Sequence, residues 1–117
     1  MAVNLVGGTT SASAALAFNA QTGTTYTLVA ADAENKLVTM SNASAITLTV
    51  PPSVFTVGQQ INVASIGVGL TTFSQGAGVT ITSTGATSSA PKIRTQHSAC
   101  TVICTASNTF LIVGDLS

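Results

Sequence analysis

Two cysteines, Cys100 and Cys104, are the first side chains in this 117-residue chain that could do chemistry. In an extended strand, residues four apart point to one face, and their Cα atoms lie about 13 Å apart at about 3.3 Å per residue. A disulfide needs Cα atoms within about 7 Å, so we expect two buried, reduced and unpaired thiols. Zinc is disfavoured because the spacing is not that of a zinc knuckle and His97 is the chain's one imidazole.

The other groups that could act in catalysis are isolated from one another. His97 and Ser98 are adjacent, so a strand would place them on opposite faces, whereas catalysis needs a nucleophile, a base and an orienting group together. Asp32 and Glu34 fall in a polar bend, where a solvated turn is favoured over a carboxylate pair. Gly76-Ala77-Gly78 is not a phosphate loop, because neither a lysine nor a helix follows it. We therefore expect no catalytic residue, no cofactor and no metal.

Two of the three cations, Lys92 and Arg94, alternate along a predicted polar strand over residues 92–97. This pattern favours an exposed strand face. The alternative is a small cationic stripe that meets an acidic partner or holds a subunit interface.

The chain is almost uncharged, with three cations and three carboxylates that sum to zero. Typical soluble domains have about a quarter of their residues charged, and weakly charged surfaces tend to associate. We therefore expect an oligomer; the alternative is a monomer coated with Ser and Thr hydroxyls. Three cations cannot form a phosphate-binding cluster, so nucleic acid is not an expected partner. No apolar run approaches the roughly 20 residues of a membrane span, and no signal peptide is expected.

Short alternating runs between turn residues indicate the fold class. Ile46, Leu48 and Val50 share one face of an extended run that ends at Pro51, which cannot continue a central strand. The turn residues before this run predict a hairpin between Val38–Met40 and Ala45–Val50.

The whole chain predicts about eight to nine short strands with turns every 8–12 residues, as in a small antiparallel β-sandwich or barrel. No fixed period is visible, which disfavours a solenoid. We expect residues 1–23 to form an extended N-terminal arm anchored by apolar side chains, with a disordered tail as the alternative, and residues 24–117 to form one β-domain. The expected anchors are Leu5, Val6, Leu16 and Phe18. The expected core consists of Tyr26, Leu28, Val38, Met40, Ile46, Leu48, Val50, Ile61, Val63, Val102 and Leu111.

From residue 24 onward, the order of these pieces resembles a small β-module that is common in tailed-phage virion proteins. A Thr-Leu-rich strand leads to an Asp-Ala bend and a Lys-plus-hydrophobic strand, and an Asn-Ala-Ser-Ala turn leads to an alternating strand ending in Pro-Pro. A glycine-rich hairpin and a Gly-Asp-Leu ending follow. The matching pieces are Asp32-Ala33, 36–40, 42–45, 46–52, 76–81 and 114–116. One departure is Glu34-Asn35, where the family often has a glycine before the lysine.

The resemblance implies a structural protein with no catalytic residues to carry over. Its members are small stand-alone head proteins or segments of tail fibres, so we expect a capsid decoration or head-fibre protein, a homotrimer on the capsid exterior, assembled in the host cytoplasm. The expected partner is the major capsid protein, contacted by the arm anchors, with Lys92 and Arg94 as further interface candidates. A tail-fibre or tail-tip component is the alternative, disfavoured because 117 residues leave no room for a long shaft. A carbohydrate-binding module or small hydrolase is a third reading, disfavoured by the lack of Trp, the single Tyr and the missing carboxylate pair.

Overall fold

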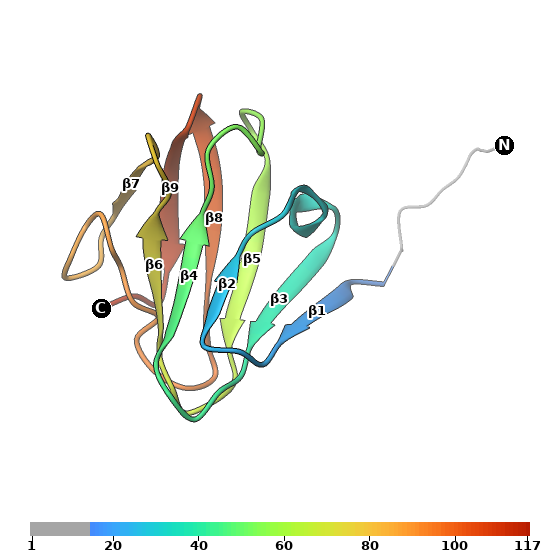
Figure 1. The fold of residues 1–117 in the computed structure, drawn as a ribbon, viewed down its shortest axis with the longest axis vertical. Helices are drawn as coiled ribbons and strands as arrows, with labels where there is room; N and C mark the ends of the chain where they lie inside the picture. The colour runs from blue at the N-terminus through green and yellow to red at the C-terminus, as the bar shows by residue number, and fades with distance from the viewer. Residues whose placement is uncertain (1–14) are drawn as a thin grey trace, which may run out of the picture.

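The computed structural model describes residues 15–117, which fold into a six-stranded and a three-stranded β-sheet packed face to face (Figure 1). The strands are β1 (Ala17–Gln21), β2 (Thr25–Thr27), β3 (Lys36–Met40), β4 (Ile46–Val50), β5 (Gln60–Ser65), β6 (Thr71–Gln75), β7 (Thr80–Ser83), β8 (Ser98–Ala106) and β9 (Thr109–Gly114), with a short 3-10 helix, η2 (Ala30–Ala33). The sheet orders are β1-β3-β5-β8-β9-β7 and β2-β4-β6. The expected all-β class and the expected number of strands are confirmed for the described residues.

The first six strands alternate between the two sheets, so the chain winds through three stacked layers. β1 and β2 form the first layer, β3 and β4 the second, and β5 and β6 the third. Each strand runs parallel to its neighbour in the next layer. The expected antiparallel pairing is therefore wrong for this half of the fold. The expected hairpin between Val38–Met40 and Ala45–Val50 is also wrong, because β3 and β4 lie in different sheets.

The stack is a short solenoid whose layers differ in length, and this explains why no period is visible in the sequence. Ala17 pairs with Lys36, an offset of 19 residues (36 minus 17). Leu37 pairs with Asn62, an offset of 25 residues (62 minus 37). Solenoids are recognised in a sequence by a constant repeat length, so these unequal layers hide the winding.

The turns that join the two sheets also stack, and their close packing requires glycine. The Asn42 side-chain amide donates a hydrogen bond to the Thr22 carbonyl at 2.8 Å, and the Gly69 N–H donates to the Asn42 carbonyl at 2.9 Å. A Cβ atom at Gly69 would lie 1.9 Å from the Ser44 carbonyl oxygen. The third-layer turn thus lies directly against the second-layer turn, where a larger residue would push the layers apart.

The C-terminal half completes the six-stranded sheet, and here antiparallel pairing does occur. β8 is antiparallel to both β5 and β9, whereas β7 is parallel to β9. The predicted strand over residues 92–97 is wrong: this segment forms only isolated bridges from Lys92 to Thr72 and from Ile93 to Leu116. It runs along the outer edge of β6, where the Phe73 N–H donates to the Pro91 carbonyl at 2.9 Å.

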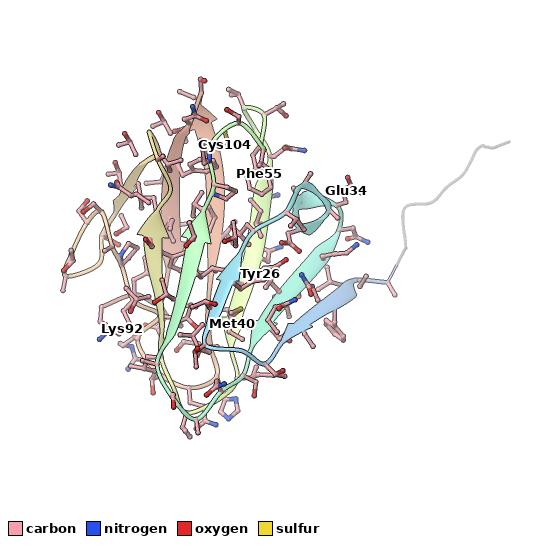
Figure 2. All side chains as sticks on the ribbon, in the orientation of Figure 1. Tyr26, Glu34, Met40, Phe55, Lys92 and Cys104 are labelled. Atoms are coloured by element: carbon pink, nitrogen blue, oxygen red, sulfur yellow. The ribbon has the colours of Figure 1, made fainter. Side chains whose placement is uncertain are left out.

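The hydrophobic core fills the space between the two sheets, and most of the expected core residues lie in it. The confirmed residues are Leu28, Val38, Met40, Ile46, Leu48, Val50, Ile61, Val63 and Val102. Figure 2 labels Met40 and Tyr26 in this region; Tyr26 packs against the core but is only partly buried. The prediction that Leu111 lies in the core is wrong, because its neighbours Phe110 and Ile112 point inward instead. Every residue from 110 to 113 is apolar, so alternation alone could not choose the inward face of β9.

The boundary expected between arm and domain at residue 23 is also wrong. β1 pairs along its whole length with β3, so residues 17–21 are an integral edge strand of the six-stranded sheet. The bend before β3 is shaped by Asn35, which has a φ of 57° and donates from its side-chain amide to the Ala15 carbonyl at 3.2 Å. Asparagine tolerates this left-handed conformation better than most residues.

Candidate interaction surface

The outer face of the six-stranded sheet carries a row of uncharged side chains that crosses five strands. Phe18 pairs with Leu37, Leu37 with Asn62, Asn62 with Thr101, and Thr101 with Val113. Aligned partners in neighbouring strands point to the same face of a sheet, and Leu37 alternates with the buried Val38. The row therefore points away from the core. This face lies behind the three-stranded sheet in the view of Figure 1.

A shallow hollow of about 470 Å³ opens in the middle of this face. It is lined by Leu16, Leu37, Asn62, Ala99, Cys100, Thr101, Val113 and Gly114. Gly114 has a φ of 143°, and a Cβ atom there would lie 2.6 Å from the Cα of Cys100, so only glycine fits where the end of β9 lies against β8. The lining is mostly apolar, and none of the chain's charged residues belongs to it.

Two of the predicted interface residues come together on this face. Leu16 lines the hollow and is 42% exposed, and Phe18 in β1 is 71% exposed. Leu5 and Val6 lie outside the described residues. The sequence alone did not point to Leu37 or Val113, because alternation does not show which strands lie side by side. Only the pairing of β3, β5, β8 and β9 brings them together.

The two predicted cationic residues do not belong to the lining of this hollow. Both are exposed, with the buried Ile93 between them, and Figure 2 shows Lys92 at the margin of the molecule opposite Glu34. Arg94 is engaged by Asp115: Nε donates to Oδ1 at 2.6 Å and Nη2 donates to Oδ2 at 2.9 Å. Asp115 also accepts from the Ser98 hydroxyl at 2.6 Å. The hydrogen bonds from Arg94 and Ser98 lower the pKa of Asp115 below its ordinary value.

A second polar cluster lies at the first layer, where the sequence predicted a solvated bend. That prediction is wrong for Asp32, whose side chain is only 1% exposed. Its Oδ2 accepts from the Tyr26 hydroxyl at 2.7 Å and from the Val29 N–H at 2.9 Å, and its Oδ1 accepts from the Asn19 side-chain amide at 2.8 Å. Gln21 donates in turn to Asn19 Oδ1 at 2.7 Å. The carboxylate thereby ties β1, β2 and η2 together.

This cluster is built to hold structure rather than to transfer protons. Burial, followed by the hydrogen bond to the Asp32 carboxylate, raises the pKa of Tyr26 to about 12, so the hydroxyl stays protonated and keeps donating. The sequence does contain a signal for the role of Asp32, which is its position three residues after Val29. An aspartate whose side chain reaches back to the N–H three residues earlier is half of a capping box at a helical turn.

The thiols offer no reactive centre on the described surface. Cys100 and Cys104 are free and buried, as expected from their spacing. Burial raises the pKa of Cys100 to about 12, so its nucleophilic thiolate form is scarce at neutral pH. Within residues 15–117 no group of three or more His, Cys, Asp or Glu side chains could hold a metal ion. No helix among these residues is long and apolar enough to cross a membrane.

Comparisons of the chain with protein-family models, with curated protein sequences and with solved structures found no match in any of the three. The candidate surface therefore has to be interpreted from its own chemistry. It is an uncharged, partly hollow sheet face with exposed apolar side chains at the edge where the described chain begins.

Proposed function

We propose that this chain is a structural protein of a bacteriophage virion, which binds the outer surface of the capsid as an oligomer and decorates or stabilises the head. One observation carries the proposal. Exposed Leu16 and Phe18 form an apolar patch on an uncharged sheet face, and both belong to the segment of residues 1–23 that was expected to be the capsid-binding arm. Patches of exposed apolar side chains mark sites of protein–protein contact.

The low charge supports a protein partner and assembly with copies of the same chain. Since the whole chain carries six charged residues, little electrostatic repulsion keeps copies apart. The proposed oligomer is a trimer, because a trimer fits the local three-fold positions of an icosahedral shell. Three tethered arms can then bind together, and avidity can exceed the affinity of one arm by a factor of about 10² or more. The partner would be the major capsid protein.

The stacked layers give specific support to one alternative, a tail-fibre or tail-tip component. Parallel layers of the kind formed by β1 to β6 can be extended by adding further layers. The first layer has only one neighbour in each sheet among the described residues, so its far edges are the place where such an extension would attach.

A variant lacking residues 2–14 tests the proposal against undecorated capsids in a co-sedimentation assay. The cut stops before β1, because a longer deletion would remove an edge strand of the sheet. We expect the shortened protein to keep the β-sheet circular dichroism and the oligomeric mass of the full chain, and to stay in the supernatant while the full chain pellets with capsids. A shortened protein that pellets as well as the full chain would refute the role of the arm. A full chain that is monomeric at micromolar concentration would refute the proposed oligomer.

A further inference from the structure

We propose that the outer face of the six-stranded sheet is a contact between copies of this chain, in which Phe18 of one copy occupies the hollow on the face of another. The inference deepens the proposed function by naming the surface through which the subunits associate. It depends on two features of one face: an exposed aromatic side chain, and an apolar hollow that the side chains of residues 15–117 of the same copy leave open.

Phe18 is the projecting feature. Its side chain is 71% exposed, more than that of any other large hydrophobic residue in the described chain, and it stands on a strand at the edge of the sheet. A large exposed aromatic ring gains free energy when it leaves water, and interface centres are rich in such rings. Because Phe18 is mostly exposed, it does not occupy the hollow beside it in its own copy.

The hollow suits an apolar occupant. Its two polar side chains are joined to each other, since the Thr101 hydroxyl donates to Asn62 Oδ1 at 2.8 Å. The small residues Gly114 and Ala99 and the apolar residues Leu37 and Val113 belong to its lining. With no charged group in the lining, a charged ligand would lose hydration there without an opposite charge as compensation.

A second copy of the chain is the occupant that best fits this face. A charged partner surface would be desolvated against it without compensation, whereas another copy presents the same uncharged row and supplies its own Phe18. The contact is reciprocal when two copies face each other across a two-fold axis, and it forms a closed ring when each Phe18 enters the next copy around a three-fold axis.

Engineered disulfides in the full chain test the contact directly. Phe18 and Val113 lie four strand spacings apart in one copy, about 19 Å at about 4.8 Å per spacing, well beyond the roughly 7 Å that a disulfide can bridge. A Phe18→Cys, Val113→Cys double variant can therefore form this bond only between copies. We expect mild oxidation to give covalent oligomers on a non-reducing gel, and the two single variants to give far fewer. Absence of covalent oligomers from the double variant, or equal amounts from the single variants, would overturn the proposal.

Sedimentation velocity of the full chain provides a second, independent measurement. Phe18→Ser removes the ring, and Val113→Lys places a charge at the hollow; both side chains are exposed, at 71% and 40%, so the core is left intact. Each change should raise the dissociation constant between copies by roughly 10- to 100-fold, as expected for one buried aromatic side chain. Val68→Ser, which removes another exposed apolar side chain at a turn outside this face, is the matched control and should change it less than about threefold.

The outcomes separate this inference from the proposed function. Variants at Phe18 and Val113 that associate like the full chain would overturn the interface, even if capsid binding through residues 2–14 were retained. A dimeric rather than trimeric mass that is lost on Phe18→Ser supports the interface and contradicts only the proposed trimer. Loss of association together with normal co-sedimentation of monomers would support the interface and show that capsid binding does not require it.

Discussion

Replacing Asp32 by alanine should be among the most damaging single changes in this domain, although the sequence places the residue in a polar bend. The carboxylate is 1% exposed and accepts three hydrogen bonds, from Asn19, Tyr26 and Val29. Its removal leaves the Tyr26 hydroxyl and the Val29 N–H without this acceptor. It also separates β1 and β2 from η2, which the carboxylate holds together.

The expected loss follows from these contacts. An unsatisfied buried donor costs about 1–3 kcal/mol, and hydrogen bonds to a charged group contribute about 1.5–3 kcal/mol each. All three hydrogen bonds are only partly buried, so each loss falls toward the lower end of these ranges. The Asn19 amide also donates to the Tyr26 oxygen at 2.8 Å, so its loss is the smallest of the three. The desolvation that the carboxylate undergoes on folding offsets part of the total. We therefore expect a loss of about 3–5 kcal/mol in the free energy of unfolding, a large share of the 5–15 kcal/mol of a typical domain.

Urea unfolding followed by circular dichroism measures this loss, and Glu34 provides the matched control. It is a carboxylate in the same bend, but its side chain is exposed. Glu34→Ala should change the free energy of unfolding by no more than about 0.5 kcal/mol. Asp32→Asn should fall between the two, because it keeps the shape of the side chain but presents an N–H group where one of the donors now points. Equal losses for Asp32→Ala and Glu34→Ala would refute the reasoning, since the carboxylate would then have no structural role.

The remaining predictions concern the core, the thiols and the C-terminal ion pair. Leu48→Ala should lower the free energy of unfolding by about 2–5 kcal/mol. Leu111→Ala, on the outer side of β9, should lower it by less than half as much. The reverse order in urea melts would mean that the inward face of β9 is misassigned. Cys100 and Cys104 should react with a thiol reagent only as fast as the domain unfolds, and rapid labelling of both in the native protein would contradict their burial. The lowered pKa of Asp115 means that its ion pair contributes stability above the ordinary aspartate value of 3.8 and loses it as the pH falls through the lowered pKa. Replacing its arginine partner by glutamine should therefore lower stability at neutral pH more than near pH 3, and equal effects at both pH values would contradict the pairing.

The sequence was sufficient to predict most of the strands and most of their inward faces. Residues 46–50 alternate cleanly between apolar and threonine side chains, and Ile46, Leu48 and Val50 are buried as expected. Alternation identifies the buried face of a strand because side chains point to opposite sides with a period of two. It carries no information on which strand lies alongside, so parallel layers could not be told from a hairpin.

The parts that could not be predicted depend on contacts between distant segments. The outer row from Phe18 to Val113 exists only because five strands pair in one register. Asp32 is buried because Asn19 and Tyr26 reach it from two different strands, whereas composition alone places an aspartate beside a glutamate in solvent. Local pattern identifies elements, and the burial of polar groups depends on the tertiary structure around them.

An electron-microscopy reconstruction of the virion that contains this chain is the most direct test of the proposed function. Density that fits residues 15–117 should lie on the outer surface of the capsid, with the β1 edge facing the shell, because the proposed arm continues from that edge. The density should be lost from particles assembled without the protein. Density confined to the tail would support the fibre alternative instead, and its absence from every part of the particle would contradict a structural role in the virion.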